Sequence, residues 1–454
     1  MELTDKNVIV IGTGISGIGA AKLLISKGAN VILYDEREEI ATERIFEELS
    51  EYTARFTLVT GKIKENQLEN IMLAVFSPGV PMDSQIAMII KASGIRIWGE
   101  IELAYQYAQG NLLAITGTNG KTTTTSLLGQ IMRDNTSQVF VVGNIGNPYT
   151  QEVDAMTNDS VTVAEISSFQ LETIDTFKPM VSAVLNITPD HLNRHHTMDE
   201  YARVKFEIAR NQTKTDFCVL NYEDTYCRDF SKQCKANVIF FSSKQKLQDG
   251  FYLDGDIICR CVQGVRTTLL NIHDMNLLGI HNVENVMAAI AMADAYGVPM
   301  EQILNTVRHF KAVEHRIEFV ATKRGVDYYN DSKGTNPDAA IRGIRAMRKP
   351  TILIGGGYDK QSEYDEWIQA FDGKVKYLVL IGQTREKIAK CANMHGFTNV
   401  ILADSFQEAM DFCVEKAVSG DAVLLSPACA SWGMFPNYEV RGNMFKEYVN
   451  QIKE

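Results

Sequence analysis

A glycine-rich segment, Gly117-Thr-Asn-Gly120-Lys121-Thr122, stands between an expected strand, Leu112–Thr116, and an expected helix. Glycines let the backbone curve around an anion, and the free amides at the start of a helix attract phosphate. Lys121 can reach the terminal phosphates of a nucleotide, and the Thr122 hydroxyl can bind Mg²⁺. Only two residues separate the glycines, fewer than in the common loop. Strand, loop and helix in this order still predict ATP binding rather than a chance turn.

A second glycine-rich turn, Gly12-Thr-Gly14-Ile-Ser-Gly17, follows the expected strand Asn7–Gly12 and precedes a helical pattern over Ile18–Lys27. Asp35 follows the next expected strand, Asn30–Tyr34. This arrangement is typical of a turn that binds the pyrophosphate of a nucleotide, with the aspartate near the ribose or base. The pattern fits NAD, another nucleotide or a purely structural turn.

Two further expected strands of the central segment end in side chains that can bind metal. Glu165 ends the strand Val161–Glu165, and Asp190-His191 follows the strand Val181–Ile187. A single Glu or His in a loop is usually solvated. Ligands, however, collect at the carboxyl ends of parallel strands, which places these residues beside the phosphate-binding loop. We expect Glu165 to hold Mg²⁺, directly or through water.

The last third contains three polar segments that each follow an expected strand. These segments are Asn330–Asn336 after Val326–Tyr329, Gly355–Lys360 after Thr351–Ile354, and Leu425–Ser431 after Ala422–Leu425. Any one of them could be only a polar turn. Together their hydroxyls, amides and lysines predict a pocket for a small carboxylated substrate.

These motifs require several α/β elements to position them. A length of 454 residues predicts about three domains at about 150 residues each. The alternation of strand and helix patterns predicts three α/β domains with mostly parallel sheets. We expect a Rossmann-like domain over 1–98, a central phosphate-loop ATPase-like domain over 99–312, and a Rossmann-like C-terminal domain over 313–454.

Composition narrows the class of protein. The net charge of −11 argues against a nucleic-acid partner, because proteins that bind nucleic acid usually have a basic surface. No apolar run reaches membrane-spanning length and the N-terminus lacks a signal-peptide pattern, so we expect a cytoplasmic protein. Of eight cysteines only Cys259 and Cys261 are close. On a strand they would share a face, which makes a metal site geometrically possible, but without a second pair at ligand spacing we interpret the cysteines as reduced thiols.

Taken in order, the motifs resemble the Mur ligases of bacterial cell-wall synthesis. The short loop Thr116–Thr124 is shared with folylpolyglutamate synthases, so it indicates only the superfamily. The stretches that narrow the resemblance are Glu165–Glu172, Gly279–Asn285, Asn330–Asn336, Ser426–Ser431 and Asn437–Gly442. The resemblance covers essentially the whole chain and is closest to the member that adds D-glutamate to UDP-N-acetylmuramoyl-L-alanine.

The resemblance implies three substrate sites. Residues expected at ATP are Gly117, Thr118, Asn119, Gly120, Lys121, Thr122, Thr123, Asn285, Arg316 and Asp331. Residues expected at the UDP-substrate are Thr13, Gly14, Ile15, Ser16, Asp35, Glu36, Arg37, Asn144 and His191. Residues expected at D-glutamate are Lys333, Thr335, Lys360, Ser431 and Tyr438, with Lys333 also beside the phosphates.

The resemblance further implies two Mg²⁺ sites. Their expected ligands are Thr122, Glu165, His191 and Lys205. By pattern alone Lys205 is an ordinary lysine of an expected helix, Glu200–Asn211, whose stem covers apolar surface. The resemblance implies that Lys205 is a carbamylated lysine, in which bound CO₂ turns the amine into a carboxylate. Lys121, Glu165, His191 and Lys205 are then the expected catalytic residues.

The implied reaction forms an amide at the expense of ATP. Transfer of the γ-phosphoryl group makes an acyl phosphate, the amine of D-glutamate attacks it, and phosphate leaves. Such transfer depends chiefly on positioning and on neutralising charge. We expect a monomeric enzyme of peptidoglycan synthesis, and so of cell-wall biogenesis, cell shape and cell division.

Other functions stay open. A folylpolyglutamate synthase would share the loop, and a nucleotide-binding regulator or an NAD-dependent oxidoreductase could use Gly12–Gly17. The chain also departs from the Mur pattern at Gly334, where alanine is more usual. Trp432-Gly433 replaces a less bulky, acidic pair near the expected glutamate site.

Overall fold

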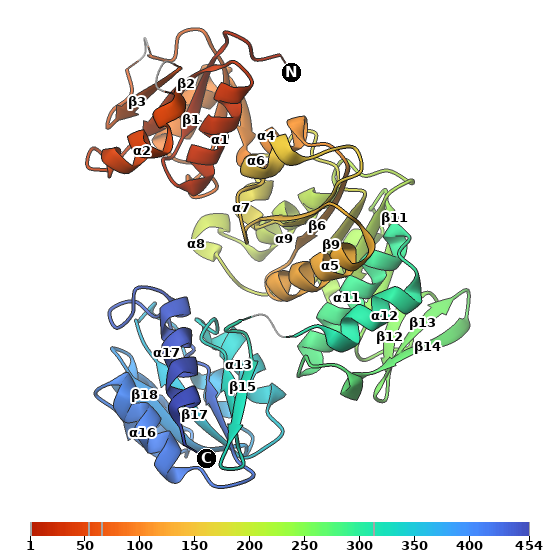
Figure 1. Cartoon of the computed structure of the whole chain (residues 1–454), viewed down its shortest axis with the longest axis vertical. Helices are drawn as coiled ribbons and strands as arrows, with labels where there is room; N and C mark the ends of the chain where they lie inside the picture. Colours follow the sequence, from red (N-terminus) through yellow and green to blue (C-terminus); the bar gives the residue numbers. More distant parts are fainter. Residues whose placement is uncertain (1, 53–54, 65–66, 312–313, 454) are drawn as a thin grey trace. The chain divides into compact units, whose positions relative to one another are not determined.

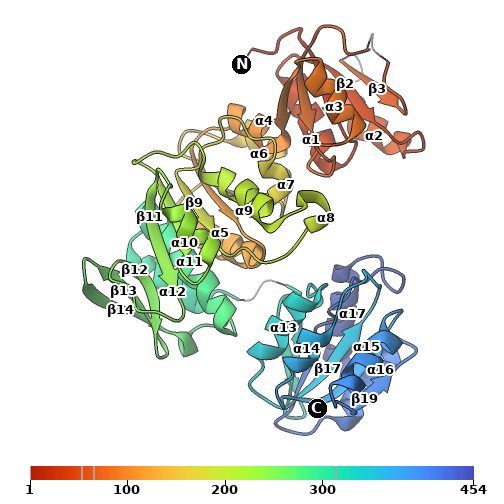
Figure 2. The same ribbon diagram turned by 180° about the vertical axis from the view of Figure 1, so that it is seen from behind.

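The computed structural model describes residues 2–52, 55–64, 67–311 and 314–453 as two compact units of mixed α/β structure (Figures 1 and 2). The first unit holds the described residues up to Ile272 together with Glu284–Arg308. The second holds His273–Val283 and the described residues from His309 onward. The expected boundaries at 98/99 and 312/313 stay predictions, and residues 312–313 lie outside the described residues.

The first sheet has five parallel strands in the order β3-β2-β1-β4-β5. The strands are β1 (Asn7–Ile11), β2 (Asn30–Asp35), β3 (Phe56–Thr60), β4 (Ile71–Phe76) and β5 (Arg96–Gly99). The associated helices are α1 (Ile15–Ser26), α2 (Thr42–Glu48) and α3 (Gln85–Ala92). Four of the five residues of β1 are buried, as expected for a central parallel strand that is covered on both faces.

The second sheet has nine strands in the order β14-β13-β12-β11-β10-β9-β6-β8-β7. The strands are β6 (Asn111–Thr116), β7 (Val139–Gly143), β8 (Val161–Glu165), β9 (Val181–Val184), β10 (Phe217–Asn221), β11 (Asn237–Ser242), β12 (Gly250–Asp254), β13 (Ile257–Val262) and β14 (Val265–Asn271). The sheet is parallel from β7 to β12, whereas β12, β13 and β14 pair antiparallel. The antiparallel extension was not predicted.

Nine helices belong to this part of the described chain. They are α4 (Glu100–Tyr107), α5 (Lys121–Asn135), α6 (Tyr149–Glu152), α7 (Ser168–Leu171), α8 (Leu192–His195), α9 (Met198–Phe206), α10 (Thr225–Ser231), α11 (Ile280–Tyr296) and α12 (Met300–His309). Among them α5 packs on β7 and β8, directly behind the phosphate-binding loop. No helix of the described residues is both long enough and apolar enough to span a bilayer.

The third sheet, in the second unit, has six strands in the order β15-β16-β20-β17-β18-β19. The strands are β15 (Glu318–Lys323), β16 (Val326–Asn330), β17 (Thr351–Gly356), β18 (Val375–Ile381), β19 (Val400–Leu402) and β20 (Ala422–Leu425). The helices are α13 (Pro337–Ala346), α14 (Asp365–Gln369), α15 (Arg385–Met394), α16 (Phe406–Lys416) and α17 (Tyr438–Gln451). Only β15 pairs antiparallel. The expected α/β class with three mostly parallel sheets is confirmed.

Some expected element boundaries were wrong. The strand expected over Val181–Ile187 ends at Val184, because Asn186 and Ile187 turn away to bond other loops. The helix expected over Glu200–Asn211 begins at Met198 and ends at Phe206, where a 3₁₀ turn takes over. The first helix begins at Ile15 rather than Ile18, so it extends further into the glycine-rich turn.

Candidate active site

The phosphate-binding loop is held by the segment that follows β9. The N–H of Thr118 donates to the Asn186 carbonyl at 2.9 Å, and the N–H of Asn119 donates to Asn186 Oδ1 at 2.8 Å. Asn186 Nδ2 returns a bond to the Asn119 carbonyl at 3.0 Å. The two segments meet because β6 and β9 are neighbours in the sheet. Sequence reasoning missed Asn186, and its position just beyond a strand end was the one signal for it.

Two lysines converge on the carbonyl oxygen of Gly117. Lys121 Nζ donates to it at 2.9 Å and Lys205 Nζ at 2.8 Å. Lys205 is only 1% exposed. Burial, reinforced by the nearby charge of Lys121, lowers the pKa of Lys205 well below its usual range. Lys205 therefore keeps a larger share of neutral amine near neutral pH than an exposed lysine does.

Gly120 gives the loop room beside Asn285. Its φ is +88°, and a Cβ added there would lie 2.1 Å from Asn285 Oδ1. We expect Gly120→Ala to raise the KM for ATP by about tenfold or more, because the clash and the strained backbone together cost about 1–3 kcal/mol. Steady-state kinetics with varied ATP measures the effect.

Gly297→Ala is the matched control for this prediction. Gly297 also has a positive φ, +104°, but nothing lies within 4 Å of an added Cβ. The control therefore carries the backbone strain without the clash. Equal KM values for ATP in the two variants would contradict a role for the space at Gly120.

Glu165 ends β8, next to the loop strand β6. The side chain is 1% exposed, and its Oε1 accepts a bond from Asn144 Nδ2 at 2.7 Å. Its other oxygen, Oε2, is buried and has no hydrogen-bond partner within the described residues. A buried carboxylate oxygen without a partner is costly, and Mg²⁺ prefers such oxygen ligands. The residues present therefore fit the expected cation at Glu165.

His191 lies on the loop that leads into α8. Its Nε2 is 3.5 Å from Asp190 Oδ2, and its ring packs edge-on against Phe169 with the centroids 4.8 Å apart. About half of its side chain is exposed. The imidazole is thus accessible and held from one side by an aromatic ring.

Arg194, on α8, was not singled out from the sequence. Its guanidinium donates to Glu172 and to the carbonyls of Pro78 at 3.0 Å and Val80 at 3.2 Å. It also lies over the Phe169 ring, 4.2 Å from the centroid. Arg194 therefore ties the His191 loop to the turn that follows β4.

A cavity of about 520 Å³ lies at the carboxyl ends of β1, β2 and β4. Its walls combine the glycine-rich turn, the end of β2 and the turn after β4. The residues are Ile11, Gly12, Thr13, Gly14, Ile15, Ser16, Tyr34, Asp35, Glu36, Arg37, Ser77, Pro78, Gly79, Val80, Pro81, Ser84 and Ile86. Of the residues expected at the UDP-substrate, the seven on the first sheet line this one cavity, whereas Asn144 and His191 lie on the second-sheet loops.

Asp35 fixes two sides of this cavity. Its carboxylate accepts bonds from Thr13 Oγ1 at 2.6 Å and from Arg37 Nε and Nη2 at 2.9 Å. The Arg37 guanidinium, chiefly, holds the pKa of Asp35 well below its usual range. Asp35 is therefore a carboxylate over the whole physiological pH range, and it clamps the glycine-rich turn to the end of β2.

In the second unit, Asp331 follows β16 and Ser426 follows the neighbouring strand β20. Ser426 Oγ donates to Asp331 Oδ2 at 2.6 Å, and the N–H of Ile317 donates to Oδ1 at 3.3 Å. Burial raises the pKa of Asp331 to about 7. Arg316 lies nearby, and its Nε is buried without a hydrogen-bond partner in the described part of the chain. The positive charge of Arg316 therefore favours the ionised form of Asp331 and opposes the effect of burial.

The raised pKa of Asp331 predicts a pH-dependent stability. Folded Asp331 keeps its proton up to pH about 7, so its contribution to the free energy of unfolding is lost as the pH rises from about 4 to 7. Against Asp331→Asn, which never ionises, we expect the native protein to lose roughly 4 kcal/mol over this window. Urea unfolding of both proteins at several pH values measures it, and parallel pH profiles would contradict it.

A buried arginine ties together the loops that carry the expected glutamate residues. Arg441 is 0% exposed, and it donates to Ser332 Oγ at 2.9 Å and to the Ser332 carbonyl at 2.8 Å. It also donates to the Cys429 carbonyl at 3.4 Å. Arg441 belongs to the stretch Asn437–Gly442, but no sequence pattern predicts this contact.

Four of the residues expected at D-glutamate lie on loops from the same edge of the third sheet, since β16, β20 and β17 are neighbours, and Tyr438 is the first residue of α17. Lys333 Nζ lies 5.4 Å from the centre of the Tyr438 ring. Lys360 Nζ lies 5.3 Å from the centre of the exposed Trp432 ring. Ser431, which precedes Trp432 in the sequence, is buried.

Three family models match the chain one after another. The Mur ligase MurD-like N-terminal domain matches residues 6–99, the Mur ligase middle domain matches 115–293, and the Mur ligase glutamate ligase domain matches 315–429. Together these matches cover most of the chain. They fall on the segments that form the three sheets.

Relatives that match over their full length are D-glutamate ligases with the same name. UDP-N-acetylmuramoylalanine--D-glutamate ligase from Lachnospira eligens is 59% identical over 453 residues, with 100% of both chains covered. The ligases of the same name from Lachnoclostridium phytofermentans and Clostridioides difficile are 54% and 45% identical, again over 100% of both chains.

Solved structures share the fold. UDP-N-acetylmuramate-alanine ligase MurC from Thermotoga maritima aligns with a TM-score of 0.61 at 17% identity, covering 99% of this chain and 100% of that one. MurF ligase from the same organism aligns with a TM-score of 0.60 at 16% identity, covering 99% and 96%. At such identities these structures support only the fold. The family assignment depends on the three family models and on the full-length relatives. The chain belongs to the Mur ligase family.

Proposed function

We propose that this chain is an ATP-dependent ligase that adds D-glutamate to UDP-N-acetylmuramoyl-L-alanine. One observation carries the proposal: the 59% identity to a D-glutamate ligase, which extends over the full length of both chains. The fold and the loop geometry support it. The enzyme would act in peptidoglycan synthesis as a cytoplasmic monomer, without a nucleic-acid partner.

The phosphate-binding loop is the proposed site of ATP. Lys121 would leave its bonds to the loop carbonyls and neutralise the terminal phosphates, and the amides of the loop would hold them. The proposed ATP residues are Gly117, Thr118, Asn119, Gly120, Lys121, Thr122, Thr123 and Asn285, with Arg316 and Asp331 from the second unit.

Two Mg²⁺ ions are proposed near this loop. Thr122 and Glu165 would hold one ion, and His191 together with a carbamate on Lys205 would hold the other. When bound, the ions would supply positive charge against the phosphates and the reacting carboxylate. The orphaned Oε2 of Glu165 supports the first site, and the buried, readily neutralised amine of Lys205 supports the carbamate.

The reaction that these residues would serve has two steps. The carboxylate of the UDP-substrate attacks the γ-phosphorus of ATP, which yields an acyl phosphate and ADP. The amine of D-glutamate then attacks the acyl carbon, and a tetrahedral intermediate collapses with loss of inorganic phosphate. Lys121 would stabilise the charge on the phosphoryl group in the first step.

The first-sheet cavity is the proposed site of the UDP part of the substrate. The turn Thr13–Ser16 would bind the diphosphate, and Asp35–Arg37 would bind the uridine, with Asn144 and His191 further along the substrate. The proposed D-glutamate residues are Lys333, Thr335, Lys360, Ser431 and Tyr438. We assign these three roles to domains at 1–98, 99–312 and 313–454.

Dependence of phosphate release on both co-substrates tests the proposed function. We expect release from ATP only when UDP-N-acetylmuramoyl-L-alanine and D-glutamate are both present. L-Glutamate and L-alanine are the matched controls for the amino acid. Phosphate release with another amino acid in place of D-glutamate, or with folate substrates, would overturn the assignment.

Trp432 gives a prediction specific to this chain. Its ring contacts Lys360, and a cation–π contact at an exposed site is worth about 0.5–1 kcal/mol. We therefore expect Trp432→Ala to raise the KM for D-glutamate about two- to fivefold with little change in kcat. Trp432→Phe keeps a ring under the ammonium group and should retain most of the affinity. A KM for D-glutamate that is the same in the alanine variant and the native enzyme would argue against this contact.

A further inference from the structure

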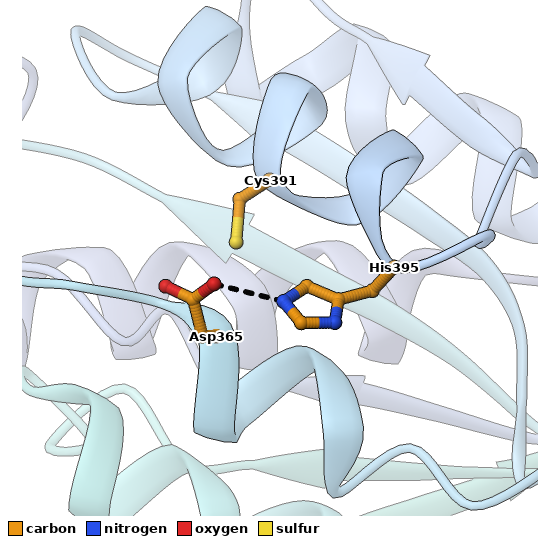
Figure 3. Close-up of side chains that lie close together, drawn as sticks. All are labelled: Asp365, Cys391 and His395. Carbon is orange, nitrogen blue, oxygen red and sulfur yellow. Dashed lines mark hydrogen bonds and ion pairs between the residues drawn. The ribbon is translucent and has the colours of Figure 1, made fainter.

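Three side chains that the proposed reaction does not use converge on the surface of the second unit (Figure 3). They are Asp365, the first residue of α14, and Cys391 and His395 from the end of α15. Their ligand atoms all lie within 4.8 Å of one another, and His395 Nε2 is 2.8 Å from Asp365 Oδ1. A search of the described residues for His, Cys and carboxylate side chains at the spacing of a metal centre finds this group.

We propose that Asp365, Cys391 and His395 form a binding site for a divalent transition metal such as Zn²⁺. A thiolate, an imidazole nitrogen and a carboxylate oxygen are the ligand types that zinc takes in proteins. Mg²⁺ and Ca²⁺ prefer sets made of oxygen alone, so this site differs in chemistry from the oxygen-rich site at Glu165. Three protein ligands leave the fourth position of a tetrahedral ion to water.

The backbone holds these ligands in a fixed arrangement. Cys391 lies in the last turn of α15, and His395 caps the end of this helix four positions later, so the two side chains project to the same side. Beside them Ile388 and Ala392, at 0% exposure, anchor α15 in the core, and Trp367 does the same for α14. The two helices contact each other directly. Little reorganisation is then needed to close the ligands around an ion.

The surroundings of the thiol argue against a nucleophilic cysteine. In Figure 3 the dashed line joins the His395 imidazole to the Asp365 carboxylate, and the Cys391 thiol lies close to that carboxylate as well. Burial and the negative charge of Asp365 both raise the pKa of Cys391, so the imidazole does not activate the thiol. A metal cation reverses this balance because it favours the thiolate and neutralises the carboxylate.

The consequence of metal binding is a cross-link between α14 and α15. An ion that binds the folded chain alone shifts the unfolding equilibrium toward the native state. α15 also carries Lys387, whose Nζ lies 3.6 Å from Asp359 Oδ1, next to Lys360. The site would therefore stiffen the helix that borders the loop of Lys360.

Titration of the full-length, chelator-treated protein with Co²⁺ in excess Mg²⁺ tests the proposal. We expect one bound Co²⁺ per chain with a thiolate-to-cobalt charge-transfer band, displaced by Zn²⁺. Cys391→Ser should abolish the band, and His395→Gln or Asp365→Asn should weaken Co²⁺ binding by about 10- to 100-fold or more. Zn²⁺ should raise the Tm of the native protein but not that of Cys391→Ser.

Cys234→Ser is the matched control, because Cys234 is also a partly buried free cysteine but lies outside the cluster. It should keep the band and the Zn²⁺-induced rise in Tm. Cobalt bound only at oxygen ligands gives no thiolate band, so binding at the Glu165 site is distinguished. Absence of the band in the native protein, or its persistence in Cys391→Ser, would overturn the site.

Discussion

Lys121→Ala is expected to lower the kcat of ligation by about 10²–10³-fold, the usual loss when one preorganised donor to a developing charge is removed. Lys121 already lies within the loop, bonded to the carbonyls of Gly117 at 2.9 Å and Thr118 at 3.0 Å. A small swing of its side chain brings the ammonium group to a bound phosphate. Phosphate release at saturating ATP, UDP-substrate and D-glutamate measures the loss.

The control for this prediction removes a lysine elsewhere in the same unit. Lys232 is 75% exposed and pairs with Asp229 on the surface, so Lys232→Ala should retain the native kcat. Binding of the UDP-substrate to Lys121→Ala, measured by calorimetry, should also be unchanged because its proposed cavity lies on another sheet. A Lys121→Ala enzyme within threefold of the native rate would contradict the role of the loop.

Lys205→Met is expected to cost a comparable share of activity, about 10²-fold or more, if a carbamate on this lysine supports a metal ion. The neutral amine is the form that reacts with CO₂. The lowered pKa of Lys205 makes this form available near neutral pH, and protonation removes it as the pH falls. Native enzyme prepared without CO₂ should therefore regain activity when bicarbonate is added, and regain less at lower pH.

Methionine keeps the apolar stem of Lys205 and so separates packing from the chemistry of the amine. Lys205→Met should fold, bind ATP and show no response to bicarbonate. A ¹³C signal from a carbamate carbon should appear in native enzyme supplied with ¹³C-bicarbonate and be absent from the variant. Full activity in Lys205→Met, or a bicarbonate response there, would rule out the carbamate.

The fold was predictable where burial makes strands continuously apolar. β8 and β20 begin and end at the expected residues because both faces of a central parallel strand are covered. The strands β12–β14 escaped prediction. In β13 the charged Arg260 interrupts the apolar run, and its partner Asp294 comes from a distant helix at 2.7 Å. Only the tertiary structure shows how that charge is compensated.

Site residues could be found from the sequence when they lie close together along the chain, but not when they contact distant partners. The phosphate-binding loop is local, because its glycines, lysine and helix start are consecutive in sequence. Lys205 instead reaches a carbonyl 88 positions away, and Arg441 bonds Ser332 across 109 positions. A helix pattern carries no information on such partners. The family resemblance supplied Lys205, whereas nothing in the sequence supplied the contact of Arg441.

The bonds of Arg194 have a consequence for the design of inhibitors. Its guanidinium holds two carbonyls of the turn at residues 78–80, which forms one wall of the 520 Å³ cavity. A compound that pushes this wall outward must break charge-assisted bonds of a cation that is only 11% exposed, and this penalty subtracts from its affinity. Scaffolds thin enough to leave the turn in place avoid the penalty. Shape, more than added contact area, should therefore separate strong from weak ligands of this cavity.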